Sequence, residues 1–513
     1  MKTWLLILGA AITLFNLAVP ITAKRKVVCY HGSWSVYRPG DGKFEIEYID
    51  PNLCTHVIYT FVGIEYNGGI RILDSWNEID KGGFRRFNDL KKRNPSLKTS
   101  VAIGGWNEGS STYSSVVNDA TRRAAFVKNI VDFVKQYEFD GFDLDWEYPA
   151  QRGGAATDKA AFILLLKELR VKFDEHGLLL SAAVASAESS ASLSYNILEV
   201  GKYLDFINVM TYDLHGSWDP VTGHSAPLYG GPNDGLTVDA AIQYWITQGA
   251  PREKIILGIG TYGRSFTLSS ASQCSIGAPT IGAGSAGPYT REAGALGYNE
   301  ICERVSTWNV KWDDQQKVPY ACNGNQWVGY DDIRSTTHKA EYVVQHDLGG
   351  AMIWSVETDD FLGKCHGVKY PLLKAINDVL FGDVPPSKNQ STSESQPATT
   401  TAKATTTTSK ATTSKSTTTT TTAAITTTAA APPAGQDSTS PTQPPDAPTD
   451  SGSSDPPKLC TEEGYVRDPN DKRIFYQCHK FSGDFTAFRF ECALGLVFDI
   501  SINVCNWASA VKD

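Results

Sequence analysis

The segment FDGFDLDWEYP, at residues 139–149, contains four acidic side chains within eight residues. Three of them, Asp143, Asp145 and Glu147, alternate with large apolar residues. Side chains two residues apart on a β-strand share a face, so this spacing predicts three carboxyl groups on one face and an apolar set on the other. Carboxyl groups this close cannot all stay ionised at low cost, and acids with perturbed pKa values concentrate at functional sites. The segment therefore predicts a catalytic carboxylate cluster.

Two other interpretations of the acidic segment are a solvated edge and a calcium-binding loop. The large hydrophobic residues between the acids argue against a solvated edge. The segment also lacks the glycine and the ligand spacing of an EF-hand, and we expect no metal site. Asp140 precedes the alternating pattern and is better explained as a support for the loop that enters the strand.

The elements that must position these acids are eight apolar, β-rich segments along residues 24–386. They are VVCYH, THVIYTFV, LKTSVAIGG, FDGFDLDW, LLLSAAVA, LDFINVMTY, KIILGIGTY and GGAMIWSV. Several are followed by amphipathic helical patterns, which favours a parallel sheet covered by helices. Eight strand–helix units fit an α/β fold of the closed (β/α)8 TIM-barrel type. No glycine-rich dinucleotide fingerprint opens a helix, which argues against an open, doubly wound sheet.

Aromatic and polar residues recur where these predicted strands end. The segments AIGGWNEGS, NVMTYDLHGSW, GTYGRSF and MIWSVETDD supply them. Active sites of this fold lie at the carboxyl ends of the strands, so a cleft for stacking sugar rings is expected there. The gap before the eighth strand is too long for a connecting helix alone, and an inserted α+β subdomain at about residues 265–335 is expected to wall one side of the cleft.

The N-terminal segment and the net charge indicate the cellular location and the kind of partner. Residues 1–23 begin with a basic residue, continue as an apolar stretch and end in small residues, which indicates a cleaved secretory signal peptide. No later segment is apolar for the length that a bilayer requires, so we expect a secreted, extracellular protein without a membrane partner. The formal net charge of −9 gives no electrostatic reason to expect nucleic acid, whereas a neutral polymer would suit it.

Residues 387–457 form a compositionally distinct segment dominated by Thr, Ser and Pro. Such a segment cannot bury enough apolar surface to offset its ordering entropy. We expect an extended, O-glycosylated linker, in which Asn389 begins an N-glycosylation sequon.

Ten cysteines, an even number, suit an oxidising compartment, and none has the Cys-x-x-Cys spacing of a zinc site. We therefore expect disulfides throughout. Six cysteines precede residue 366: Cys29, Cys54, Cys274, Cys302, Cys322 and Cys365. The pairing of the last four stays open.

The motifs also resemble a known family. FDGFDLDWE matches the D-x-x-D-x-D-x-E signature of the family 18 glycoside hydrolases, and SVAIGGWN, MTYD, GTYGRSFTL and WSVETDD resemble its other blocks in the family's order. The similarity covers nearly all of residues 26–382, and CYHGSWSVYRPGDG is most similar to the secreted arthropod chitinases. The resemblance implies hydrolysis of β-1,4-linked N-acetylglucosamine polymers, and no cofactor is expected.

The resemblance assigns roles to the acids. Glu147 would protonate the glycosidic oxygen while the acetamido oxygen of the substrate attacks its own C1, giving an oxazolinium ion and net retention. Asp145 would orient the acetamido N–H and stabilise the developing positive charge, and Asp143 would share a proton with Asp145. Tyr212 would hydrogen-bond to the acetamido carbonyl, with Asp213 as its neighbour in the pocket.

The same resemblance implies the residues that bind the substrate. Trp354 would form the floor of the central subsite. The others would line the groove: Trp34, Ser75, Trp76, Gly104, Gly105, Trp106, Asn107, Tyr148, Met210, Thr211, Trp218, Tyr262 and Arg264.

Residues 458–513 contain four cysteines and many aromatic residues, which indicates a small disulfide-rich β module. FYQC, LVFD and VCNW match blocks of the peritrophin-type chitin-binding domain. That family usually has six cysteines, and the two absent here pair with each other, so the resemblance implies the pairs Cys460–Cys478 and Cys492–Cys505. Some aromatic side chains would stack on sugar rings or form the small core: Tyr476, Phe485, Phe488 and Trp507.

Three kinds of function remain open. The favoured one is a monomeric, secreted endo-chitinase that binds chitin and chito-oligosaccharides and carries a tethered binding module. A catalytically inactive chitin lectin is a rival, although such relatives typically replace the acid at the position of Glu147. A structural chitin-matrix protein is the second rival. Within the family, an endo-N-acetylglucosaminidase acting on glycoproteins is an enzymatic alternative.

Overall fold

The computed structural model describes residues 25–230, 235–382, 464–481, 484–492, 496–500 and 504–507. The chain divides into two units, Met1–Gln396 and Pro397–Asp513. The predicted signal peptide, the predicted linker and Asn389 lie outside the described residues and stay predictions. None of the helices among the described residues combines the length and apolar character needed to cross a membrane.

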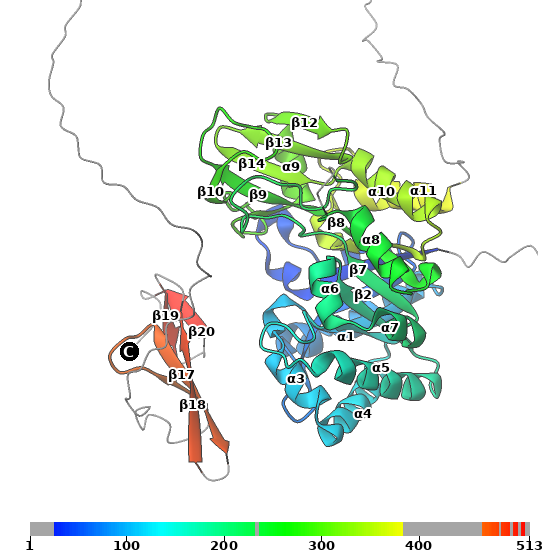
Figure 1. Ribbon diagram of the computed structural model, residues 1–513, viewed down its shortest axis with the longest axis vertical. Coiled ribbons are helices and arrows are strands. Elements are labelled where there is room, and N and C mark those ends of the chain that lie inside the picture. Colours follow the sequence, from blue (N-terminus) through cyan, green and yellow to red (C-terminus); the bar gives the residue numbers. More distant parts are fainter. Residues whose placement is uncertain are drawn as a thin grey trace, which may run out of the picture. The chain divides into compact units, whose positions relative to one another are not determined.

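The first unit contains a closed barrel of eight parallel strands (Figure 1). The strand order is β1-β15-β8-β7-β6-β5-β4-β2, and pairing of β1 with β2 closes the barrel. Both faces of such strands are covered, which explains their nearly continuous apolar sequences. The eight predicted segments form these strands, so the predicted TIM barrel is confirmed: β1 Lys26–Gly32, β2 His56–Ile64, β4 Lys98–Gly104, β5 Gly141–Asp145, β6 Leu179–Ala185, β7 Phe206–Met210, β8 Ile255–Gly260 and β15 Gly350–Trp354.

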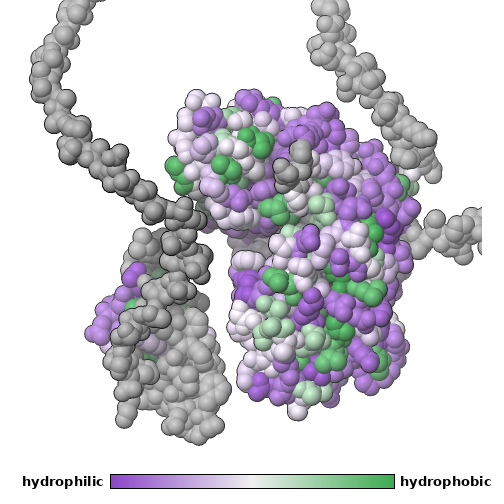
Figure 2. Space-filling view, in the orientation of Figure 1, coloured by the Kyte–Doolittle hydropathy of each residue, from purple (hydrophilic) through white to green (hydrophobic). Residues whose placement is uncertain are grey.

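Helices cover the outside of the barrel (Figure 1). In α4 the spacing of Phe126, Ile130 and Val134 places one apolar stripe against the barrel, and all three are fully buried. The side chain of Asp119 accepts hydrogen bonds from the first backbone N–H groups of α4 and so sets where the helix begins. On the side of the first unit that Figure 2 shows, hydrophilic residues cover most of the surface and patches of hydrophobic residues lie among them. The helices are α1 Gly83–Asn88, α2 Leu90–Arg93, α3 Ser111–Val117, α4 Ala120–Gln136, α5 Asp158–Asp174, α6 Glu188–Ser194, α7 Ile197–Tyr203, α8 Val238–Thr247, α10 Ile333–Gln345 and α11 Pro371–Phe381.

An inserted α+β subdomain lies between β8 and α10, as the sequence predicts. Its six-stranded antiparallel sheet has the order β10-β9-β14-β13-β12, and β11 pairs with β9. The chain enters this sheet directly after β8, so Tyr262 and Arg264 lie on its first strand, β9. The sequence pattern had instead placed both residues at the end of a barrel strand, and that prediction is wrong. The elements are β9 Tyr262–Leu268, β10 Thr280–Ala283, β11 Ala295–Gly297, α9 Tyr298–Val305, β12 Asn309–Asp313, β13 Val318–Asn323 and β14 Gln326–Tyr330.

One short strand escapes sequence prediction. β3, Ile70–Ile72, pairs antiparallel with residues 62–64 at the end of β2, as a hairpin outside the closed ring of eight strands. Three residues are too few to show an alternating pattern, so only the pairing partner reveals the strand.

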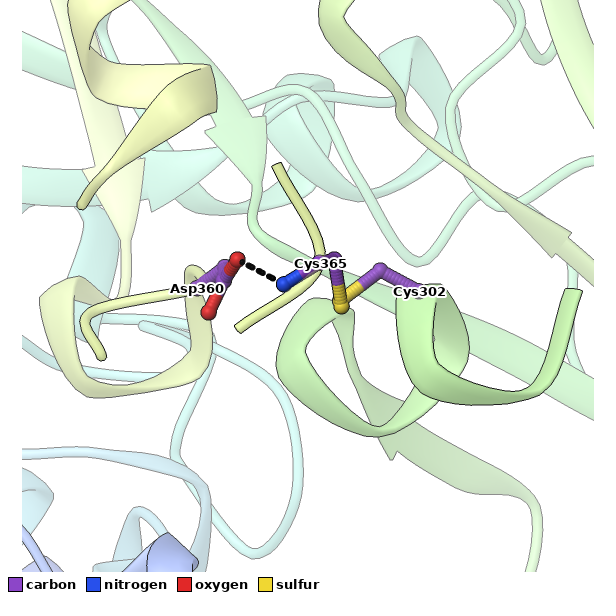
Figure 3. A group of neighbouring side chains, drawn as sticks. All are labelled: Cys302, Asp360 and Cys365. Atoms are coloured by element: carbon purple, nitrogen blue, oxygen red, sulfur yellow. Dashed lines mark hydrogen bonds between the residues drawn. A yellow bond between two sulfur atoms is a disulfide. The ribbon is translucent and has the colours of Figure 1, made fainter. Parts of the chain in front are cut away.

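Three disulfides join distant parts of the first unit, and they settle the pairing that the sequence left open. Cys29 pairs with Cys54, Cys274 with Cys322, and Cys302 with Cys365. Figure 3 shows the last pair beside Asp360, whose carboxylate accepts a hydrogen bond of 2.9 Å from the backbone N–H of Cys365. Both sulfur atoms are in the disulfide, so they are not thiolates, and this Cys–Asp–Cys group is structural and not a metal site.

The second unit is a small β module, as predicted. β16 Gly464–Arg467, β17 Ile474–Phe481 and β18 Asp484–Glu491 form an antiparallel sheet, and β19 Leu496–Asp499 pairs with β20 Val504–Trp507. Phe475 stacks on Phe498 with ring centroids 3.9 Å apart, which provides a minimal core. Cys478 and Cys492 are both disulfide-bonded, while the side chains of their predicted partners lie outside the described residues.

Candidate active site

Strand β5 carries the acids to the carboxyl end of the barrel. Asp143 and Asp145 are buried, and Glu147 follows two residues after the strand ends. The alternating apolar residues pack on the other side, where Trp146 stacks on Tyr113 with ring centroids 5.0 Å apart. The alternation in the sequence therefore produces the two faces that it predicts.

Asp143 is held by polar groups from three other strands. Its carboxylate accepts hydrogen bonds from Tyr30 Oη at 2.7 Å, Ser181 Oγ at 2.5 Å and Asn208 Nδ2 at 3.3 Å. Burial raises the pKa of Asp143 to about 6, although these hydrogen bonds oppose the rise. The sequence analysis did not identify these three donors; for Ser181 and Asn208 the signal is a single polar residue inside an otherwise apolar strand.

Asp145 has a free acceptor in a buried position. Its Oδ1 atom has no hydrogen-bond partner among the described residues. Burial, followed by the charges of Glu147 and Asp143, raises the pKa of Asp145 well above its usual value. An unsatisfied buried acceptor costs about 1–3 kcal/mol, so this oxygen would gain from a hydrogen-bond donor supplied by a ligand.

Glu147 is a carboxyl group whose pKa lies near neutrality. Burial raises its pKa to about 7, while a hydrogen bond from Tyr148 and the charge of Arg152 lower it and Asp213 raises it further. Arg152 Nη1 donates to the backbone oxygens of Glu147, at 2.9 Å, and of Trp106, at 2.8 Å. Its guanidinium also lies 3.5 Å from the centroid of the Trp106 ring. Arg152, which the sequence analysis did not identify, thus connects the acid to an aromatic residue of the groove.

The inserted sheet supplies an opposite group of side chains. Arg264 contacts both carboxylate oxygens of Asp213, with Nε at 2.7 Å and Nη2 at 2.5 Å. Tyr262 donates to the same carboxylate at 2.6 Å. Such bidentate, charge-assisted contacts fix orientation, and here they join the loop after β7 to β9. The Arg264 guanidinium lies 5.4 Å from the centroid of the Trp218 ring.

Tyr212 follows β7 and is almost fully buried. Its hydroxyl contacts only a weak acceptor in the described chain, Met352 Sδ at 3.8 Å. Its neighbour Thr211 donates to the backbone oxygen of Gly258 at 2.6 Å, and Met210 is buried at the strand end. The hydroxyl of Tyr212 therefore remains available to a stronger acceptor.

Trp354 ends β15 and belongs to an aromatic cluster. Its ring centroid lies 5.8 Å from that of Phe61, 5.5 Å from that of Tyr30 and 6.2 Å from that of Trp34. Four other tryptophans named from the sequence expose between 42% and 59% of their surface, which is unusual for so large an apolar ring: Trp34, Trp76, Trp106 and Trp218.

A pocket of about 510 Å³ lies beside the acid cluster and not over it. The residues predicted from the sequence that line it are Trp34, Gly104, Gly105, Trp106 and Asn107. The sequence analysis did not identify the remaining lining residues: Ser33, Phe61, Arg71, Leu73, Asp74, Glu78 and Glu108. Ser75 and Trp76, although adjacent in sequence, are exposed and do not line this pocket.

Two glycines connect the pocket to the acid strand. Gly104 and Gly105 have φ values of 111° and 79°, and a Cβ atom on Gly104 would lie 2.2 Å from the backbone oxygen of Asp145. Gly105 N–H donates to that oxygen at 2.8 Å. Only glycine permits this close approach, so the pocket wall and Asp145 are placed side by side.

Asp140 lies at the opposite end of β5, as the sequence analysis expected. It accepts hydrogen bonds from Thr99 N at 2.9 Å and Lys91 Nζ at 3.1 Å. These contacts join the start of β5 to β4 and α2, so Asp140 supports the loop.

Comparison with known proteins identifies the family. Residues 26–359 match the model for glycosyl hydrolases family 18, and residues 460–513 match the chitin-binding Peritrophin-A domain. The chain belongs to family 18 of the glycosyl hydrolases. This family 18 chain is 42% identical over 419 residues to "Probable chitinase 2" of Drosophila melanogaster, covering 74% of this chain and 86% of the relative. It is also 42% identical over 396 residues to "Endochitinase" of Manduca sexta, covering 73% and 71%.

A solved structure agrees with this assignment. The crystal structure of the Ostrinia furnacalis group IV chitinase in complex with allosamidin is 46% identical, with a TM-score of 0.68. The match covers 69% of this family 18 chain and 98% of that chain. The match therefore spans nearly all of that crystallised chain.

Proposed function

We propose that this protein is a chitinase that hydrolyses β-1,4-N-acetylglucosamine linkages with retention, by a substrate-assisted mechanism. The observation that carries the proposal is the pairing of Glu147, a carboxyl with a pKa of about 7, with the unpartnered buried oxygen of Asp145 beside an aromatic groove. The family 18 membership and the similarity to chitinases support the substrate.

Glu147 acts as the general acid and then as the general base. A pKa of about 7 keeps its proton available at neutral and acidic pH, so it can protonate the glycosidic oxygen as the bond to C1 breaks. The acetamido oxygen of the same sugar forms the new bond to C1. Glu147, now ionised, then takes a proton from the water that opens the oxazolinium ion, which restores its starting state.

Asp145 positions the reacting acetamido group. Its free Oδ1 atom can accept the acetamido N–H, which would satisfy the buried oxygen and orient the carbonyl toward C1. Burial, and then the charges of Glu147 and Asp143, raise the pKa of Asp145, which favours one proton shared between Asp143 and Asp145. As positive charge develops, an ionised Asp145 stabilises it.

Tyr212 and the opposite wall hold the sugar for this reaction. The hydroxyl of Tyr212 exchanges its weak contact with Met352 for the acetamido carbonyl. Asp213, fixed by Arg264 and Tyr262, provides a rigid polar wall. Trp354 supplies the apolar floor on which the pyranose ring packs.

A chitin-binding lectin is the second candidate, because the same groove would bind oligosaccharides without cleaving them. Retention of Glu147 favours the enzyme, since a lectin has no need of a buried carboxyl with a raised pKa. An endo-N-acetylglucosaminidase acting on glycoproteins is less favoured, because the C-terminal module matches a chitin-binding domain.

The remaining parts fit an extracellular enzyme on an insoluble polymer. We infer that residues 1–23 direct secretion, that residues 387–457 are a glycosylated linker, and that residues 458–513 hold the catalytic unit, residues 24–386, at the chitin surface. The enzyme acts as a monomer, since one chain supplies every group of the proposed site.

The test is incubation of the purified protein with colloidal chitin and identification of the soluble products by mass spectrometry. Soluble N-acetylglucosamine oligomers, released initially as the β-anomer in NMR spectra, are expected. Binding to chitin without soluble products would favour the lectin. Release of glycans from glycoproteins, with no products from chitin, would favour the endo-N-acetylglucosaminidase.

A further inference from the structure

Two acids in the wall of the pocket beside Asp145 have no role in the mechanism above. Asp74 and Glu78 lie one helical turn apart, and η4, Trp76–Asp80, carries the second. Only 2% of Glu78 is exposed. Its Oε1 atom accepts a long hydrogen bond of 3.3 Å from Tyr59 Oη, and Ser33 is a second neutral donor that lowers the pKa of the carboxyl. No hydrogen bond of normal geometry reaches its buried Oε2 atom among the described residues.

The charge of this pair is not compensated within the described chain. Asp74 accepts hydrogen bonds from neutral donors only, Asn77 N at 3.1 Å and Tyr37 Oη at 2.5 Å. The third acid of the pocket differs, because Arg71 Nη2 lies 3.0 Å from both carboxylate oxygens of Glu108. The pocket therefore presents an acidic pair that no cation neutralises and an acid that is already neutralised.

The pKa of Glu78 also reflects its burial and the lack of a nearby cation among the described residues. Desolvation, followed by the charge of Asp74, raises the pKa of Glu78 to about 7. A buried carboxyl in this state gains most from a donor that also carries positive charge, because hydrogen bonds to charged groups are roughly twice as strong as neutral ones.

We propose that this pocket is a subsite for a glucosamine unit of partly deacetylated chitin, whose protonated 2-amino group binds between Asp74 and Glu78. The proposal rests on the proposed function, and it adds a preference at one position of the same polymer. Trp34 and Trp106 offer aromatic faces for the pyranose ring, and the acids offer acceptors for the N–H donors of the ammonium group. An acetamido group would bring one neutral N–H and a methyl group instead.

The subsite lies along the path of the polymer. Gly104 and Gly105 join the pocket wall to Asp145, so a chain whose reacting sugar contacts Asp145 can extend into the pocket. The reacting sugar must still carry its acetyl group, because that group supplies the nucleophile. The preferred substrate therefore combines an acetylated sugar at the cleavage point with a deacetylated sugar in the pocket.

The experiment is hydrolysis of partly acetylated chitosan at a pH just below neutrality, where Glu78 and the glucosamine amines are both partly ionised, followed by sequencing of the products by mass spectrometry. The new reducing end should always be acetylated. At one fixed position relative to the cleaved bond, the ratio of glucosamine to N-acetylglucosamine should exceed that of the substrate about tenfold, which corresponds to about 1.4 kcal/mol. Glu78→Gln and Asp74→Asn should each return that position to the substrate composition.

The controls separate the possible failures. Glu175→Gln removes the same charge from an exposed site at the end of α5 and should keep the enrichment. If Glu78→Gln does not fold, Asp74→Asn carries the test, since Asp74 is less buried. Enrichment that persists in a folded variant of either residue overturns the assignment to this pocket. Random composition at every position beyond the reducing end also overturns it, whereas absence of any hydrolysis, including that of fully acetylated oligomers, contradicts the proposed function itself.

Discussion

Replacement of Glu147 by glutamine tests the centre of the mechanism. The amide keeps the shape of the carboxyl group but cannot deliver a proton, so kcat on chitotetraose should fall by about 10²–10⁴-fold or more. This loss corresponds to about 3–5 kcal/mol of transition-state stabilisation. Oligosaccharide binding should persist, because the aromatic floor at Trp354 and the wall at Asp213 are unchanged.

The same substitution should increase stability, and the sign follows from the pKa. Burial raises the pKa of Glu147 from 4.5 to about 7 in the folded protein. Below the lower value both states are protonated, and the residue has no effect on stability. Between the two values the unfolded chain loses its proton first, so stability falls as pH rises. Above about pH 7 the full cost, about 3 kcal/mol, destabilises the wild type and is absent from Glu147→Gln.

The assay combines rates with thermal denaturation at pH 4 and pH 8. The variant should match the wild type in Tm at pH 4 and exceed it at pH 8. Asp140→Asn, just before β5, is the matched control. Burial alone would raise the pKa of Asp140, but hydrogen bonds from Thr99 and Lys91 lower it, so that variant should lose stability at neutral pH and keep its activity. Activity of Glu147→Gln within a few-fold of wild type would refute the role of Glu147 as the acid. If the variant were unfolded, its loss of activity would be explained by lost structure and not by the missing proton.

Three further predictions concern the nucleophile, the acid and the tail. Fully deacetylated chitosan should resist cleavage and thiazoline mimics of the intermediate should inhibit strongly, whereas rapid hydrolysis of that polymer would indicate a two-carboxyl mechanism. Arg152→Gln should raise the pKa of Glu147, because the arginine charge lowers it, and should therefore move the alkaline limb of the kcat–pH profile to higher pH; a shift of that limb to lower pH would contradict this. Truncation after Gly435 should leave hydrolysis of soluble oligomers unchanged and reduce hydrolysis of crystalline chitin, because the module raises the effective concentration at the surface. Equal loss on both substrates would mean that the tail belongs to the catalytic fold.

Local patterns in the sequence were sufficient for the barrel and for the identity of the acids. The alternation of Asp143 and Asp145 with apolar residues determines which side chains share a face of β5, and Glu147 continues the pattern two residues after the strand ends. Likewise, the apolar composition of each of the eight segments is enough to predict that the segment is a buried strand. The sequence did not show where β8 ends and β9 begins, because Tyr262 continues the apolar segment of β8. Its pairing partners nevertheless lie in the inserted sheet.

Only the tertiary structure decided the environment of those acids. Tyr30 and Asn208 are 178 residues apart in sequence, yet both contact Asp143, because closure of the barrel brings β1 and β7 to the same interior. The bond between Cys302 and Cys365 and the pocket around Glu78 depend on the same long-range packing. The sequence by itself determined which residues are acidic and which way they face. Their pKa values and unsatisfied oxygens were decided by burial and by charges from distant segments, which no local pattern contains.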